Sequence, residues 1–171
     1  MPKSVFYVLV PIIVLSLQWA NDSSVTAVDS QILSPRVISD QLDTVRKITN
    51  PFPATAEFIA KGKALYFGKG FCVMCHGRDG RGLGPDQDPG FANGILPRDF
   101  TDRTWQRTRT DGELLWILEN GSPGTAMPQF VPRVLTEEEA WQVLLYVRSL
   151  GGTTVVSQQE GRPRAETDFS R

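Results

Sequence analysis

Cys72-Val73-Met74-Cys75-His76 is the stretch that decides the fold, because it holds both cysteines and the single histidine of the chain. A disulfide across two intervening residues closes a loop too short to add much stability. Three uses of such a segment remain: a redox dithiol, part of a zinc site, or attachment of a haem.

The haem interpretation fits this spacing best. Each thiol can add to one vinyl group, and the adjacent imidazole can reach the iron from the same short segment. A redox dithiol is expected beside a βαβ pattern, which is missing, and a zinc ion would need a fourth ligand that no further Cys or His supplies. The motif therefore predicts one haem c, held through two thioethers at Cys72 and Cys75, with His76 as an iron ligand.

The second iron ligand is predicted by elimination. No other histidine exists; Met1 lies in the N-terminal segment, and Met74 lies between the two cysteines. Met127 remains, in the sequence Gly-Thr-Ala-Met-Pro over 124–128, which predicts a loop between two helices. A lone methionine is more often a core residue, and that alternative stays open.

The N-terminal segment predicts export. Residues 5–19 are an apolar run behind Lys3, so residues 1–20 are a signal peptide or an uncleaved membrane anchor. We expect the anchor, because the large polar Gln18 lies where a cleavage site after Ala20 needs a small residue. The basic end would stay in the cytoplasm, which places the rest of the chain on the periplasmic side; a cleaved chain would be periplasmic.

The remaining sequence predicts one all-α domain with appendages. Residues 21–54 read as a polar linker, 55–151 as the domain and 152–171 as a disordered tail. Helices are expected to start at three caps, Thr55, Asp111 and Thr136. The 18 Lys and Arg against 19 Asp and Glu leave a net charge of -1, which does not favour nucleic acid as a partner.

From about residue 50 to 150 the chain resembles a class I, mono-haem cytochrome c domain of the bacterial respiratory type. The similar features are the Gly62 to Tyr66 helix, residues 72–77, 97–102 and 121–128, and a last helix ending at 145–148. The resemblance implies an all-α fold of three to five helices around one haem, behind the N-terminal transmembrane or signal helix. It also implies that Gly62 and Tyr66 meet the last helix near Tyr146.

The resemblance further implies that a proline carbonyl holds the second nitrogen of the His76 ring. We expect Pro97 to supply it, with Pro85 and Pro89 as alternatives. Basic residues around Trp105 could bind the haem propionates, with Arg98 and Arg109 as candidates and the indole as a further donor. The alternative is a solvated surface cluster, also containing Arg103 and Arg107, with Trp105 in the core.

With His76 and Met127 on the iron, no site is left for a small-molecule substrate, so we expect an electron carrier rather than an enzyme. Its partners would be redox proteins, as a haem subunit or tethered shuttle of a membrane respiratory complex. Two alternatives remain: a haem enzyme or gas sensor with an open sixth site, and an assembly or docking subunit of a larger membrane oxidoreductase.

Overall fold

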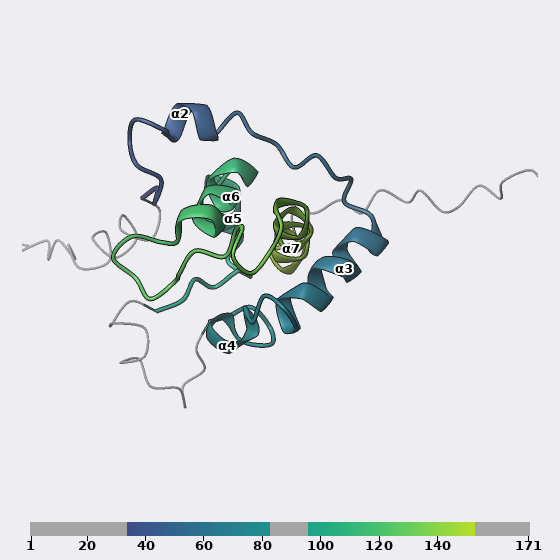
Figure 1. Cartoon of the computed structure of the whole chain (residues 1–171). Helices are drawn as coiled ribbons and strands as arrows, with labels where there is room; N and C mark the ends of the chain where they lie inside the picture. The colour runs from purple at the N-terminus through teal and green to yellow at the C-terminus, as the bar shows by residue number, and fades with distance from the viewer. Residues whose placement is uncertain (1–33, 83–95, 153–171) are drawn as a thin grey trace, which may run out of the picture.

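The computed structural model describes residues 34–82 and 96–152, and every regular element within these ranges is a helix. The predicted all-α class is confirmed for this part of the chain (Figure 1). In chain order the helices are α2 (Leu42–Val45), α3 (Ala56–Phe67), α4 (Val73–His76), α5 (Arg103–Thr108), α6 (Asp111–Asn120) and α7 (Glu137–Leu150).

Two helices begin at the predicted threonine caps. The Thr55 hydroxyl oxygen accepts from the third backbone N–H of α3, and Thr136 and Glu139 form a reciprocal capping box at α7. Each cap satisfies backbone donors that have no partner inside the helix. The start of both helices was therefore readable from local sequence.

The cap of α6 is Thr110, and the prediction of Asp111 was wrong by one residue. Glu113 lies three positions after Thr110, and its carboxylate accepts from the Thr110 backbone N–H at 2.8 Å. The Thr110 hydroxyl accepts from the Glu113 N–H in return. A threonine that completes a capping box satisfies two donors, whereas Asp111 alone would satisfy one.

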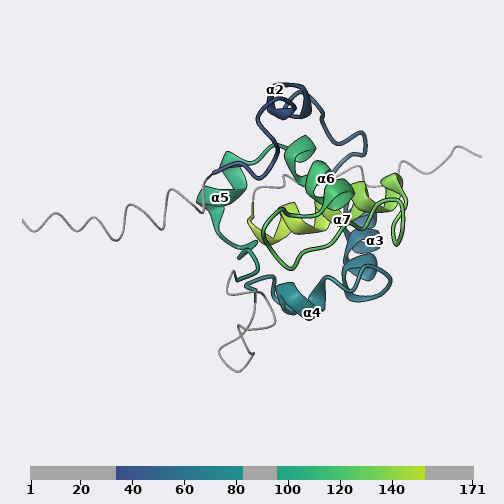
Figure 2. The same cartoon turned by 60° about the vertical axis from the view of Figure 1, so that its left-hand side comes forward.

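Helices α3 and α7 cross at close range, and Figure 2 shows α7 lying between α3 and α6. A Cβ atom on Gly62 would lie 1.9 Å from the backbone oxygen of Gln142, so only glycine permits this approach. One turn further along, the rings of Tyr66 and Tyr146 meet edge to face with centroids 5.1 Å apart. The predicted meeting of these residues is confirmed.

The main core lies where these helices meet, and a second small cluster lies on α6. Trp141 belongs to the first and Trp116 to the second, so both tryptophans are packing residues. The buried members of the main core are Tyr66, Phe100, Trp105, Leu114, Leu115, Leu118, Val131, Leu135, Ala140, Trp141, Val143, Leu144, Tyr146 and Val147.

Residues 34–54, predicted as part of a polar linker, pack against the domain instead. Val37 and Val45 are buried with Trp116 on α6, and the Asn50 side chain donates to the backbone oxygen of Trp141 at 3.0 Å. Both figures place α2 beside α6, on the opposite side from α4. The physical reason is the burial of Val37 and Val45 against Trp116, which the polar composition of the segment concealed.

No helix within residues 34–82 and 96–152 is long and apolar enough to cross a membrane. The predicted signal or anchor at 1–20, residues 21–33 of the predicted linker, and all but the first residue of the predicted tail at 152–171 lie outside the described residues.

Candidate haem site

The Cys/His segment forms the short helix α4. Cys72 occupies its N-cap position, and the His76 backbone N–H donates to the Cys72 carbonyl oxygen at 2.9 Å. This single turn brings the two thiols and the imidazole to one cavity, which all three line. Cys72 and Cys75 do not form a disulfide with each other, and burial raises the pKa of the Cys72 thiol to about 11.

The His76 imidazole is fixed by two neighbours. Its Nδ1 atom lies 3.3 Å from the carbonyl oxygen of Arg98, and its ring stacks on Phe100 with centroids 4.2 Å apart. Burial lowers the pKa of His76 to about 4, so the ring is neutral at pH 7. Because a carbonyl can only accept, the proton lies on Nδ1 and the lone pair on Nε2, the state that a metal ligand needs.

The carbonyl that holds His76 belongs to Arg98, and the prediction of Pro97 was wrong by one residue. The Pro97 oxygen instead lies against Gly82, where an added Cβ would be 2.7 Å away. Gly82 has a φ of +89° and its N–H donates to the His76 carbonyl oxygen, so the backbone path around it selects the Arg98 carbonyl for the ring. Pro85 and Pro89 lie outside the described residues.

Met127 lines the same cavity as His76, from a loop between α6 and α7. Its backbone is tied at both ends: its N–H donates to the Thr125 hydroxyl at 3.2 Å, and its carbonyl oxygen accepts from the Ser122 N–H at 3.1 Å. The side chain is half-buried against the main core. The loop therefore presents a thioether to the cavity while the core supports it.

Arg98, Trp105 and Arg109 also line this cavity. Trp105 is buried in the main core as well, so its two predicted roles are compatible. The Arg98 guanidinium lies 5.8 Å from the Trp105 ring centroid, and Arg109 donates to the Ser34 carbonyl oxygen at 2.7 Å. Arg103 and Arg107 are exposed and do not line the cavity.

Arg36 is a cavity residue that sequence reasoning missed. It comes from the segment assigned to the linker, and it lines the cavity beside Arg98 and Arg109. Burial lowers the pKa of both of those arginines, and the positive charge of Arg36 acts on both in the same direction. The signal that could have revealed this segment is the pair Val37 and Val45, two apolar residues in a polar stretch.

The cavity fits a haem c in three respects. Its walls are mainly apolar, its thiols and imidazole come from one turn, and arginines gather along part of its lining. The alternatives are not supported: within residues 34–82 and 96–152 there is no group of three metal-binding His, Cys, Asp or Glu side chains and no strand of a βαβ unit. When bound, the haem would supply an iron that changes charge by one electron.

No curated protein matches the chain. Among solved structures, it resembles a chain of the reducing HAO-like protein complex of Kuenenia stuttgartiensis, with 33% sequence identity and a TM-score of 0.48. The likeness covers 58% of this chain and 46% of that chain, so it spans less than half of the relative's length.

A family comparison gives the decisive match. Residues 59–151 match the cytochrome c family. This range contains most of α3 and all of α4, α5, α6 and α7, together with Cys72, Cys75, His76 and Met127. The matched range is more than half of the 171 residues. The family binds haem c covalently and transfers electrons, as the residues around the cavity also indicate. The chain therefore belongs to the cytochrome c family.

Proposed function

We propose that the chain is a single-haem electron carrier whose iron is held by His76 and Met127. The main support for this proposal is that both side chains line the cavity that Cys72 and Cys75 also line. With two protein ligands, the site exchanges one electron with a partner protein and binds no substrate.

The residues around the cavity have separate tasks in this proposal. The Arg98 carbonyl accepts the Nδ1 proton, which leaves Nε2 of His76 as the ligand atom and fixes the plane of the ring. Met127 supplies a soft thioether, which favours the reduced state relative to a second histidine. The apolar walls exclude water, so little solvent must reorganise when the electron moves.

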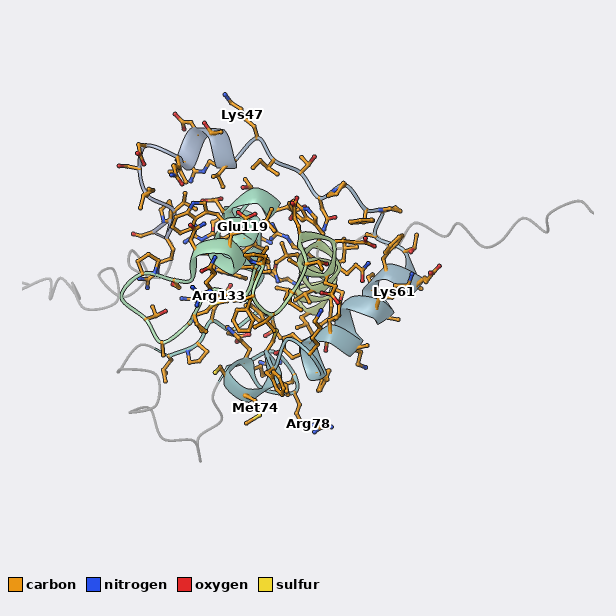
Figure 3. All side chains as sticks on the ribbon, viewed as in Figure 1. Lys47, Lys61, Met74, Arg78, Glu119 and Arg133 are labelled. Atoms are coloured by element: carbon orange, nitrogen blue, oxygen red, sulfur yellow. The ribbon has the colours of Figure 1, made fainter. Side chains whose placement is uncertain are left out.

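Met127→Ala tests the second ligand, and Met74→Ala is its matched control. Met74 is 64% exposed and points away from the domain (Figure 3), although it belongs to the haem motif. We expect a sulfur-to-iron charge-transfer band in the oxidised wild type and in the Met74 variant. The Met127 variant should lose the band, have a lower reduction potential and bind CO. An oxidised wild type without the band that binds CO freely would instead indicate the enzyme or sensor alternative.

The location and partners are part of the same proposal. We place the domain on the periplasmic side of the cytoplasmic membrane, tethered by residues 1–20, as a haem subunit or shuttle of a respiratory complex. The apolar run at 5–19 behind Lys3 supports the tether. Intact mass of protein purified from native membranes tests this: one haem added to an uncleaved chain is expected. A chain cleaved near residue 20, or one recovered in the soluble fraction, would contradict the tether.

A further inference from the structure

Residues 34–48, called here the N-terminal strap, precede the range that matches the family and still reach the cavity. The strap includes α2 and lies along α6 in both views (Figures 1 and 2). Ser34, Arg36 and Val37 line the cavity, next to residues of the family range. The strap therefore forms part of the cavity wall, although it lies outside the matched range.

Contacts with α6 hold the strap in this position. Val37 and Val45 are buried against Trp116, and the Trp116 indole N–H donates to the Gln41 side chain at 2.7 Å. The Val45 carbonyl oxygen comes so close to α6 that a Cβ on Gly112 would lie 2.0 Å from it. Because that atom is backbone, any side chain at position 112 would push the strap away.

The docked strap brings a third positive charge to the cavity, on the exposed side chain of Arg36. Arg36, Arg98 and Arg109 line one cavity, and the charges of Arg36 and Arg98 both act on Arg109. Neither Arg36 nor Arg98 has a carboxylate within ion-pair distance in the part of the chain that the structure covers. Arg36 is exposed, Arg98 is half-buried and Arg109 is buried. Like charges that line one cavity repel one another, and an anion between them reduces this repulsion.

The nearby carboxylates of Glu113 and Asp102 make their hydrogen bonds to other groups. Glu113 is 2% exposed, and its two oxygens accept from the Thr110 N–H and from Arg46. Asp102 accepts from two N–H groups at the start of α5. The charges of Asp102 and Asp99 act on Arg98, and the charge of Glu113 acts on Arg109. Within the described ranges none of these carboxylates forms an ion pair with Arg36, whereas a haem carries two propionates.

We propose that Arg36 binds a haem propionate together with Arg98, so that docking of the strap helps to set the reduction potential. This inference rests on the proposed function, because it places the haem in the same cavity. A cation beside the haem disfavours the oxidised state, which carries one more positive charge, and so it raises the potential.

Arg36→Gln tests the charge in the full-length holoprotein, with Lys47→Gln as its control. Lys47 belongs to the same strap and its side chain points into solvent (Figure 3), so it matches the change in charge without the cavity position. At the wild-type midpoint potential, Arg36→Gln should raise the ratio of oxidised to reduced protein about fourfold. Lys47→Gln should stay near wild type, and Arg36→Lys should recover most of the loss.

Gly112→Ala tests the docking independently, because its methyl group displaces the strap. It should lower the potential as Arg36→Gln does, and Arg36→Gln should have no further effect in the Gly112→Ala background. If Arg36→Gln and Lys47→Gln shift the potential equally, or if both match wild type, the inference is wrong. Intact mass and the sulfur-to-iron band distinguish failure of this inference from failure of the proposed function. A wild-type protein without the added haem mass or without the band would contradict the proposed function itself.

Discussion

Tyr66 joins the first long helix of the domain to the haem motif through one hydroxyl. Its side chain is 0% exposed, and the hydroxyl donates to the Gly77 carbonyl oxygen at 2.8 Å, one residue after His76. Removing the hydroxyl would leave a partly buried carbonyl without this donor, at a cost of about 1 kcal/mol. Tyr66 therefore has a chemical role in addition to its packing against Tyr146.

We predict that the penalty of Tyr66→Phe depends on pH. Burial raises the pKa of Tyr66, so the folded state keeps its proton above pH 10 while an unfolded tyrosine loses it. This contribution to stability is present below the unfolded pKa and is lost as pH rises, by about 1.4 kcal/mol per pH unit. The variant should be less stable at pH 7 and about equal to wild type near pH 11.

Urea unfolding of the holoprotein at several pH values measures this difference, with Tyr146→Phe as the control. Burial raises the pKa of Tyr146 too, but its hydroxyl has no hydrogen-bond partner among the described residues. Relative to wild type, Tyr146→Phe should gain free energy of unfolding at alkaline pH and should lose none at pH 7. A penalty for Tyr66→Phe that stays constant from pH 7 to pH 11 would contradict the assignment.

At the scale of single residues, sequence reasoning was most specific where the choice of residue types was small. One histidine, two cysteines and one available methionine brought it to His76 and Met127, which line one cavity. It failed for the carbonyl that holds His76, because Pro97 and Arg98 differ only in which oxygen the loop turns inward. That direction depends on backbone angles around Gly82, which residue types do not determine.

The crossing of α3 and α7 is the central contact between elements. A methyl group at position 62 would meet backbone, which cannot rotate away as a side chain can. We predict that Gly62→Ala lowers the free energy of unfolding by about 3 kcal/mol, despite the higher helix propensity of alanine. Urea unfolding of the holoprotein checks the value.

Gly124→Ala is the control for this prediction. Position 124 has a φ of +78° with nothing within 4 Å of an added Cβ, so the variant meets strain without a clash. Its cost should be about 1 kcal/mol. If the two substitutions cost the same, the close crossing does not limit residue 62.

At the scale of elements, the helices with a strong cap were the most readable. Thr136 and Glu139 predict the start of α7 because each satisfies a donor of the other. The start of α6 was displaced by one residue because Thr110 and Asp111 are both good caps, and the choice depends on Glu113. Helix α2 was missed because four residues carry too little periodicity to detect.

For the whole molecule, the strap and the main domain should unfold separately. The buried cluster of Val37, Val45 and Trp116 is separate from the main core, and α2 packs mainly against α6. We predict that Val45→Ala speeds hydrogen exchange of backbone amides in 42–48 about thirtyfold and leaves α7 amides unchanged.

Leu144→Ala is the reciprocal variant, because Leu144 is buried in the main core. It should speed exchange in α7 through global unfolding and leave the strap amides unchanged. Equal acceleration of both regions in either variant would show that the strap and the domain open as one unit.

The N-terminal boundary of the domain was the feature hardest to predict from the sequence. Composition separates residues 21–54 from the domain because they are polar, yet the attachment of residues 34–54 depends on two valines and on the missing side chain of Gly112. Such an attachment is a tertiary property: it requires knowing which face of α6 is free to receive it.

The docked strap also shortens the linker between the domain and the membrane anchor of the proposed tethered carrier. With residues 21–54 free, a fully extended chain would let the haem move about 120 Å from its membrane anchor. With residues 34–54 packed on the domain, only residues 21–33 would separate the domain from the proposed anchor. At full extension they would span about 45 Å. In the proposed tethered form, a redox partner would lie within roughly one protein diameter of the membrane surface.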